Sequence, residues 1–238
     1  MHARATSPPL RSPWTLAGTG ATCRAAATEA RLDLAAPAAG LAVGAAGRVD
    51  HLVGVDLRAA VAGPLDQWVR GADLTAIYEP DDARRLRATA MWRVWPGGPA
   101  AWELVLSAQT ALLHADAALA VVSDLDGIDA RWMQAAAGAP WTPVGAKGPL
   151  PVEAAAVLVR REGSAAIVAV HPQDPRRITV STAAGRTRVA CAIFPTAIEK
   201  GVILRSRVLA AVGPADRAES WAGELAGAFA SSPPFLDT

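Results

Sequence analysis

Arginine and tryptophan side chains gather in two segments of the chain, and together these residue types can bind an anionic sugar. An arginine guanidinium forms two parallel hydrogen bonds with a carboxylate, sulfate or phosphate. A tryptophan ring beside it can stack on a sugar ring. The residues concerned are Arg87, Arg93 and Trp95 in one segment and Arg205 and Arg207 in the other. If both segments are strands of one sheet, we expect a basic outer face that binds an acidic oligosaccharide or another anionic ligand.

The same arginines have a simpler interpretation, because solvated sheet faces commonly carry cross-strand ion pairs. Glu79, Glu103 and Glu199 lie in or beside the strands expected to flank them. In that case the arginines hold neighbouring strands together and bind no ligand. The sequence leaves both interpretations open.

The segment Trp68-Val69-Arg70-Gly71 also has two interpretations. In the functional one, Trp68 and Arg70 project from a strand end into a cleft, and Asp73 orients the arginine. In the structural one, Trp68 is a core anchor, Arg70 pairs with Asp73, and Gly71 supplies a positive φ or a bulge.

Two residues could act as a general acid or base if the protein is an enzyme. Tyr78 is the only tyrosine, and His171 begins a loop after an expected strand. Beside Arg93 or Arg205, either could remove a proton from the carbon next to a substrate carboxylate, as in elimination on a uronate. The alternative for His171 is a turn histidine capped by Asp174.

Several other chemistries lack their sequence signature. The chain has no GxxxxGK[ST] phosphate loop, no GxSxG nucleophile elbow and no HExxH zinc helix. The run from Asp124 to Asp129 resembles the start of a calcium loop but lacks the glutamate at its twelfth position. We therefore expect neither a metal nor a cofactor.

The elements that position these residues follow a two-residue rhythm, which is typical of strands with one buried face. Two strand-like runs, Asp73–Glu79 and Leu86–Trp95, flank the turn-rich segment EPDDARR. In the second run the apolar residues share one face: Leu86, Ala88, Ala90, Trp92 and Val94. A third strand, Trp102–Gln109, follows the turn PGGP and should pair antiparallel with the second.

Similar short runs extend over most of the chain and predict an all-β fold, a large, mainly antiparallel β-sandwich. Residues 1–29 are expected to be an irregular lead-in and 30–238 one sandwich domain. The stretch from 124 to 148 reads as a long loop, with room for a short helix near Ala130–Ala136. A C-terminal amphipathic helix is expected at about 214–230, with Pro214 in its first turn and Trp221, Leu225 and Phe229 in one apolar stripe.

Composition narrows the partners. The 238 residues include 23 basic and 22 acidic side chains, a net charge of +1, so no overall field favours nucleic acid or a membrane. No segment resembles a signal peptide or a membrane span, which predicts a cytoplasmic protein. Cys23 and Cys191 lack metal-ligand spacing, and Cys191 is expected to be a buried thiol. The oligomeric state is not specified.

Three segments, WVRGADL at Trp68–Leu74, MWRVW at Met91–Trp95 and EKGVILRSRV at Glu199–Val208, resemble a family of uncharacterised bacterial proteins. The resemblance covers roughly residues 50–238 and implies that these segments belong to one fold; it carries no activity. Two functions stay open: a β-sandwich that binds an acidic carbohydrate through its Arg/Trp face, and a carbohydrate-active enzyme that catalyses lyase-like elimination.

Overall fold

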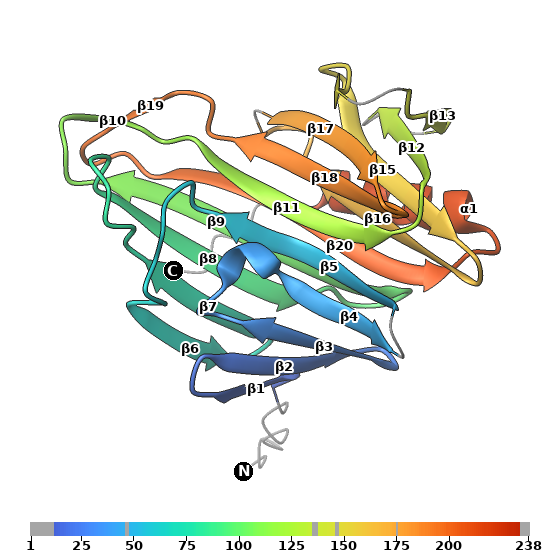
Figure 1. The fold of residues 1–238 in the computed structure, drawn as a ribbon, viewed down its shortest axis with the longest axis horizontal. Coiled ribbons are helices and arrows are strands. Elements are labelled where there is room, and N and C mark those ends of the chain that lie inside the picture. Colours follow the sequence, from blue (N-terminus) through green and yellow to red (C-terminus); the bar gives the residue numbers. More distant parts are fainter. Residues whose placement is uncertain (1–11, 46–47, 135–137, 146–147, 175, 234–238) are drawn as a thin grey trace, which may run out of the picture.

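The protein is a sandwich of two antiparallel β-sheets with one helix on its outer surface (Figure 1). The computed structural model describes residues 12–45, 48–134, 138–145, 148–174 and 176–233. Within them each main sheet has nine strands, and β10 pairs with β19 in a separate ribbon. The expected all-β, mainly antiparallel sandwich with a C-terminal helix is thereby confirmed.

The first sheet has the order β1-β2-β3-β4-β5-β11-β18-β17-β14 among the described residues. Its strands are β1 (Trp14–Ala17), β2 (Gly20–Ala25), β3 (Thr28–Asp33), β4 (Leu41–Ala45), β5 (Arg48–Asp56), β11 (Leu119–Asp126), β14 (Gly148–Pro149), β17 (Arg176–Ala183) and β18 (Arg186–Ile193). A short 3-10 helix, η1 (Pro37–Ala39), joins β3 to β4.

The second sheet has the order β13-β12-β15-β16-β20-β9-β8-β7-β6 among the described residues. Its strands are β6 (Asp66–Arg70), β7 (Asp73–Tyr78), β8 (Leu86–Val94), β9 (Ala100–Thr110), β12 (Asp129–Gln134), β13 (Thr142–Pro143), β15 (Ala154–Arg161), β16 (Ser164–Val170) and β20 (Leu204–Pro214). The separate ribbon consists of β10 (His114–Asp116) and β19 (Ala197–Glu199).

The alternation expected for β8 is confirmed, because its buried and half-exposed residues alternate from Leu86 to Trp92. Trp92 and Trp102 are fully buried between the sheets. Each indole N–H has a partner there: Trp92 donates to the carbonyl of Val53 at 3.2 Å, and Trp102 to Sγ of Cys23 at 3.1 Å. These bonds remove the penalty of burying an unpaired indole donor.

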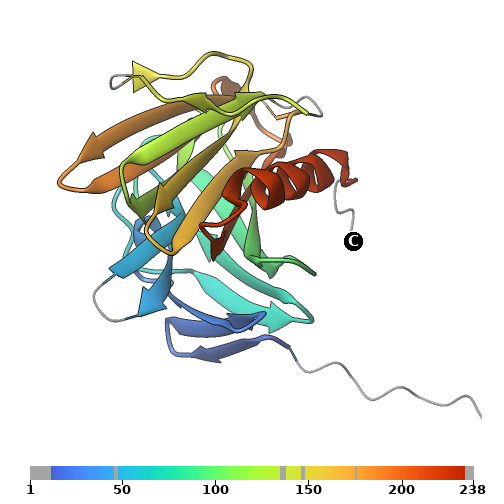
Figure 2. The same ribbon diagram turned by 90° about the vertical axis from the view of Figure 1, so that its right-hand side faces the viewer.

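The helix α1 (Ala218–Ser231) covers only part of the second sheet's outer face. It packs over β15, β16 and β20 (Figure 2). Leu225 and Phe229 face inward against Ile167 and Leu209, forming a second apolar cluster on that side of the sheet. The helix leaves uncovered the outer face of β6 to β8 and that of β9 at Val105 and Ser107.

Three expectations about boundaries were wrong. Residues 14–25, expected to be irregular, form β1 and β2, whose small and β-branched residues alternate in burial along β2. Residues 1–11 lie outside the described part. The stretch near 130–136 is a strand through Gln134, paired with β15, rather than a helix, and residues 135–137 are outside the described part.

The helix also begins later than expected. Pro214 ends β20, opposite Ser164, and the turn into the helix is made by Arg217 with φ of 57°. Trp221 is only half-buried, packing beside Gly213 and donating to the carbonyl of Pro214 at 2.9 Å. The fully inward stripe is Ala218, Ala222, Leu225 and Phe229.

Candidate functional site: a groove on the outer face of β6 to β20

An open groove of about 860 Å³ lies on the uncovered outer face of the second sheet. Five neighbouring strands, β6, β7, β8, β9 and β20, supply its lining. We call this the outer groove. It brings together four of the residues proposed to bind a ligand: Trp68, Arg70, Arg93 and Arg205.

Trp68 and Arg70 form one rim of the outer groove. Both belong to β6 and lie two residues apart, so they project from the same face about 7 Å apart. Trp68 is 39% exposed, whereas the other seven tryptophans are buried or half-buried, so its interpretation as a core anchor is wrong. Gly71, with φ of 58°, makes the expected positive-φ turn into β7.

The floor of the groove combines hydroxyl groups with apolar surface. In register across the sheet, Trp68 lies opposite Thr75, Thr75 opposite Met91, and Met91 opposite Val105. A parallel row contains Thr89, Ser107 and Arg205. In that row Nε of Arg205 donates to the hydroxyl of Ser107 at 3.3 Å.

Arg93 is held by a carboxylate at the edge of this floor. Its Nε and Nη2 donate to the two oxygens of Asp73 at 2.5 and 2.6 Å. Asp73 lies opposite both Arg70 on β6 and Arg93 on β8, and its carboxylate pairs with Arg93 rather than with the expected Arg70. Because Asp73 is engaged by Arg93, the exposed guanidinium of Arg70 forms no hydrogen bond or ion pair with the described residues.

Arg207 lies outside the outer groove, under the C-terminal end of α1. Its Nε donates to Oε1 of Glu103 at 2.5 Å, and its Nη2 to Oγ of Ser232 at 2.7 Å. Its backbone N–H donates to Oδ2 of Asp174 at 2.7 Å. With Arg207 only 4% exposed and Glu103 fully buried, this cluster fastens the helix to the sheet and keeps Arg207, which was expected to bind a ligand, away from solvent.

Arg87 and Trp95 are also outside the groove. Arg87 pairs with Glu79 at 3.3 Å on the solvent side, so two of the expected cross-strand pairs, Arg87–Glu79 and Arg207–Glu103, form. Trp95 packs edge-on against Phe229 of α1, with ring centroids 5.7 Å apart, and does not line the outer groove.

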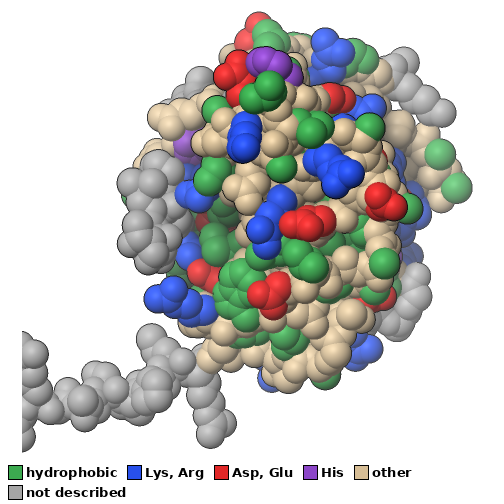
Figure 3. All heavy atoms as spheres, turned by 90° about the vertical axis from the view of Figure 1, so that its left-hand side faces the viewer, with side chains coloured by type: hydrophobic (Ala, Val, Ile, Leu, Met, Phe, Trp, Pro, Cys, Tyr) green, Lys and Arg blue, Asp and Glu red, His purple; other side chains and the backbone are tan. Residues whose placement is uncertain are grey.

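The described residues of the second sheet therefore do not form a continuous basic outer face. Three of its arginines are paired with Asp73, Glu79 and Glu103. The end of the molecule that carries β10 and β19 shows the same mixture of blue, red and green side chains (Figure 3).

Neither proposed acid–base residue reaches the groove. Tyr78 faces the interior of the sandwich, is fully buried, and donates to the carbonyl of Leu34 at 3.1 Å. Burial raises its pKa above its ordinary value. His171 is 3% exposed and lies edge-on to Phe229 at 5.4 Å, beside Arg207. The structure therefore does not place Tyr78 or His171 in one cleft with Arg93 or Arg205, as the sequence had suggested.

His171 should make the protein's stability depend on pH. Burial, reinforced by the positive charge of Arg207, lowers its pKa below 6.5, although Asp174, Ser232 and Glu103 oppose the shift. The unfolded chain then binds the proton more readily than the folded one, so stability is full above about pH 6.5 and falls as pH drops toward the folded-state pKa.

Urea unfolding of the wild type and His171→Gln at pH 7 and pH 5 measures this effect. The wild type should lose more free energy of unfolding between the two pH values than the variant, whose side chain stays neutral. An equal loss in both proteins would show that His171 is not the source of the pH dependence.

The sequence missed the polar floor of the groove. Thr89 and Met91 lie two and four residues after Arg87 in β8 and therefore share its face, so the two-residue rhythm already carried that signal. Thr75 and Ser107 required the strand register, which short-range patterns do not contain.

Comparison with known proteins identifies the fold alone. No protein-family profile and no curated protein match the chain. A crystal structure described as a putative aldose 1-epimerase from Escherichia coli K12 aligns with a TM-score of 0.50 and 11% identity, over 64% of this chain and 69% of that one. A mutant of heparan sulfate lyase HepC from Pedobacter heparinus aligns with a TM-score of 0.50 and 10% identity, over 90% of this chain.

This chain corresponds to 37% of the length of the HepC structure. At such low identity both alignments confirm a shared β-sandwich architecture. In the described residues no helix is long and apolar enough to cross a membrane.

Proposed function

We propose that the outer groove binds an acidic oligosaccharide. The observation that carries this proposal is the exposed indole of Trp68 beside the exposed guanidinium of Arg70, at the rim of a groove floored by hydroxyl groups. The apolar face of a sugar ring can stack on an aromatic ring, and the neighbouring guanidinium can donate hydrogen bonds to a carboxylate or sulfate.

The spacing of the groove favours a chain of sugars over a single one. Arg70 on β6 and Arg205 on β20 are separated by four interstrand spacings, or about 19 Å across the sheet. Between them lie Thr75, Thr89 and Ser107, whose hydroxyls can both donate and accept hydrogen bonds. A ligand that contacts both arginines must span several sugar units.

The two solved structures support a saccharide ligand through their descriptions, an aldose epimerase and a heparan sulfate lyase. Binding is favoured over lyase-like elimination, because Tyr78 and His171, the residues suggested for proton transfer, are buried away from the groove. Asp73 does lie in the groove, but its two oxygens are taken up by Arg93.

Trp68→Ala and Arg70→Ala should each weaken binding of a heparan sulfate hexasaccharide by about tenfold or more, as measured by isothermal titration calorimetry. The first removes the stacking surface, and the second removes a charge-assisted hydrogen bond worth about 1.5–3 kcal/mol. The arginine contribution should shrink as salt rises, since the site is open to solvent.

Arg188→Ala is the matched control, because Arg188 is an exposed arginine on the outer face of the first sheet. It should leave the affinity unchanged. A neutral cello-oligosaccharide of the same length tests charge selectivity and should bind more weakly. Equal affinity of wild type, Trp68→Ala and Arg70→Ala would eliminate the outer groove as the binding site.

A further inference from the structure

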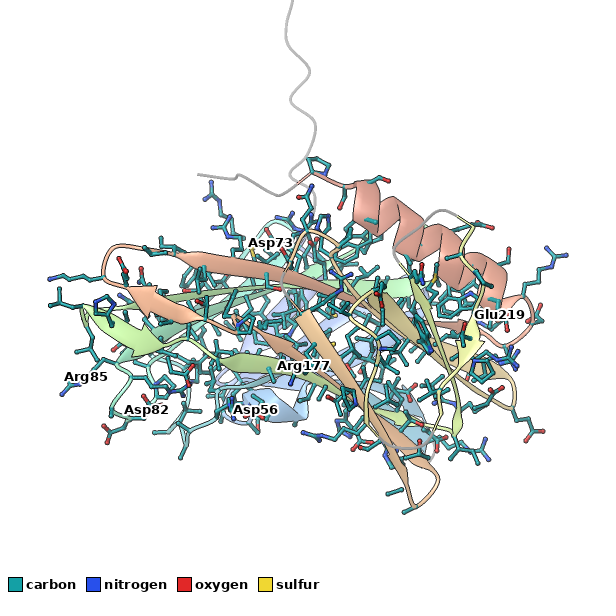
Figure 4. All side chains as sticks on the ribbon, turned by 90° about the horizontal axis from the view of Figure 1, so that it is seen from above. Asp56, Asp73, Asp82, Arg85, Arg177 and Glu219 are labelled. Atoms are coloured by element: carbon teal, nitrogen blue, oxygen red, sulfur yellow. The ribbon has the colours of Figure 1, made fainter. Side chains whose placement is uncertain are left out.

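A second groove lies on the opposite side of the sandwich, on the outer face of the first sheet. It has a volume of about 890 Å³ and is formed at one end of β5, β11, β18 and β17. We call it the distal groove. Figure 4 shows Asp56 and Arg177, which line it, toward one side of the molecule and Asp73 of the outer groove toward the other.

One row of residues across four strands gives the distal groove its shape. Asp56 lies opposite Ala120, Ala120 opposite Ala192, and Ala192 opposite Arg177. The two central methyl groups leave a trough between a carboxylate and a guanidinium. The ends of the row are three interstrand spacings apart, about 14 Å between Cα atoms. That separation leaves room for a molecule the size of one sugar between the two side chains.

The charges of the distal groove are not balanced within the protein. Its lining contains Asp56 and three arginines, Arg58, Arg176 and Arg177, which amounts to a net charge of +2. Arg177 is exposed and forms no hydrogen bond or ion pair with the described residues. The carboxylate of Asp56 accepts only the backbone N–H of Arg58, at 2.9 Å, among the described residues.

Arg176 is a second arginine of the distal groove whose guanidinium is bound by neutral groups. Its guanidinium donates to the carbonyls of Ala154 and Pro172 at 2.9 Å and of Asp174 at 3.3 Å. Within the described ranges no carboxylate comes into ion-pair distance of it. Burial lowers its pKa, as expected for a half-buried cation that is solvated by neutral carbonyls.

We infer that the distal groove binds a small dipolar ligand that carries a phosphate or carboxylate at one end and an ammonium group at the other. The anion lies by Arg177, with Arg176 behind it, and the ammonium group lies by Asp56. The alanine floor accommodates the body of the ligand. The exposed Val152, at the groove's edge, offers it an apolar wall.

Glucosamine 6-phosphate is a suitable probe, because it has both charges on a single sugar. Glucose 6-phosphate, glucosamine and inorganic phosphate each lack one part of it. Titrations followed by calorimetry should rank glucosamine 6-phosphate as the tightest of the four for the wild-type protein. Equal affinity for all four, or binding of none, would overturn the inference.

Two substitutions locate the ligand. Arg177→Ala should weaken binding of glucosamine 6-phosphate by about tenfold or more, through loss of a charge-assisted hydrogen bond. Asp56→Asn should remove the preference for glucosamine 6-phosphate over glucose 6-phosphate and leave the affinity for glucose 6-phosphate unchanged. Unchanged affinity in Arg177→Ala would contradict the assignment.

Arg70→Ala separates this inference from the function proposed for the outer groove. That variant should bind glucosamine 6-phosphate as the wild type does, even though it binds the hexasaccharide more weakly. Conversely, Arg177→Ala should keep the wild-type affinity for the hexasaccharide. Loss of glucosamine 6-phosphate binding in Arg70→Ala would assign the probe to the outer groove and refute a distal site.

Discussion

Replacing Arg207 with methionine is expected to lower the free energy of unfolding by about 3–5 kcal/mol, because the change leaves a buried carboxylate without its partner. Glu103 is fully buried, and its Oε1 receives the Arg207 Nε at 2.5 Å. The substitution also removes the hydrogen bond from Arg207 to Oγ of Ser232, which ties the end of α1 to the sheet. Urea unfolding followed by tryptophan fluorescence measures the loss.

Two further variants distinguish charge from packing. Combining Glu103→Met with Arg207→Met removes both charges and should recover part of the loss, since apolar groups of similar volume can replace a buried ion pair. Arg87→Met breaks the exposed Arg87–Glu79 pair and should cost less than about 1 kcal/mol. A loss in Arg207→Met as small as that in Arg87→Met would show that burial does not amplify this ion pair.

The fold was predictable because strand alternation is a local signal. Each residue of β8 shows in its own side chain whether it faces inward or outward, and β7, β8 and β9 follow one another with short turns. The hairpin and its third strand therefore emerged from the sequence with nearly correct bounds. Trp92 faces the interior as its neighbours Ala90 and Leu86 indicated.

The site was less predictable, because the alternation specifies a face and not what covers it. The alternation predicts an outward orientation for Arg93, Trp95 and Arg207. In the sheet, Arg93 and Arg207 do lie on the outer side. Which of them meets solvent depends on where α1 lies, and for Trp95 that contact, with Phe229, joins residues more than a hundred positions apart. Arg207 is buried under the end of the helix and Trp95 is partly covered by it, whereas Trp68 and Arg70 stay exposed.

Boundaries failed where the sequence lacks a clear hydrophobic alternation. Residues 20–25 contain no large apolar side chain, so their alternation in burial could not be read from residue types, and pairing with β3 decides the structure. The Asp73 carboxylate shows the same limit at the level of a single pair. Register places both Arg70 and Arg93 opposite it, and the ion pair forms with Arg93, the more distant of the two in sequence.

Phe229→Ala should destabilise the protein by about 3–5 kcal/mol and release the C-terminal half of α1 from the sheet. Phe229 is 1% exposed, and its ring contacts Trp95 at 5.7 Å and His171 at 5.4 Å between centroids. The guanidinium of Arg207 lies 5.1 Å from the same ring, so the substitution also removes a cation–π contact.

Leu113→Ala is the control for loss of apolar volume, since Leu113 is 77% exposed and should cost almost nothing. Amide hydrogen exchange over 218–231 separates two consequences of Phe229→Ala. Fast exchange confined to the helix would mean that α1 unfolds as a separate unit once Phe229 no longer holds it to the sheet. Uniformly faster exchange in β16 and β20 would mean that the helix is part of the cooperative core, because Leu225 and Phe229 share one apolar cluster with residues of those strands.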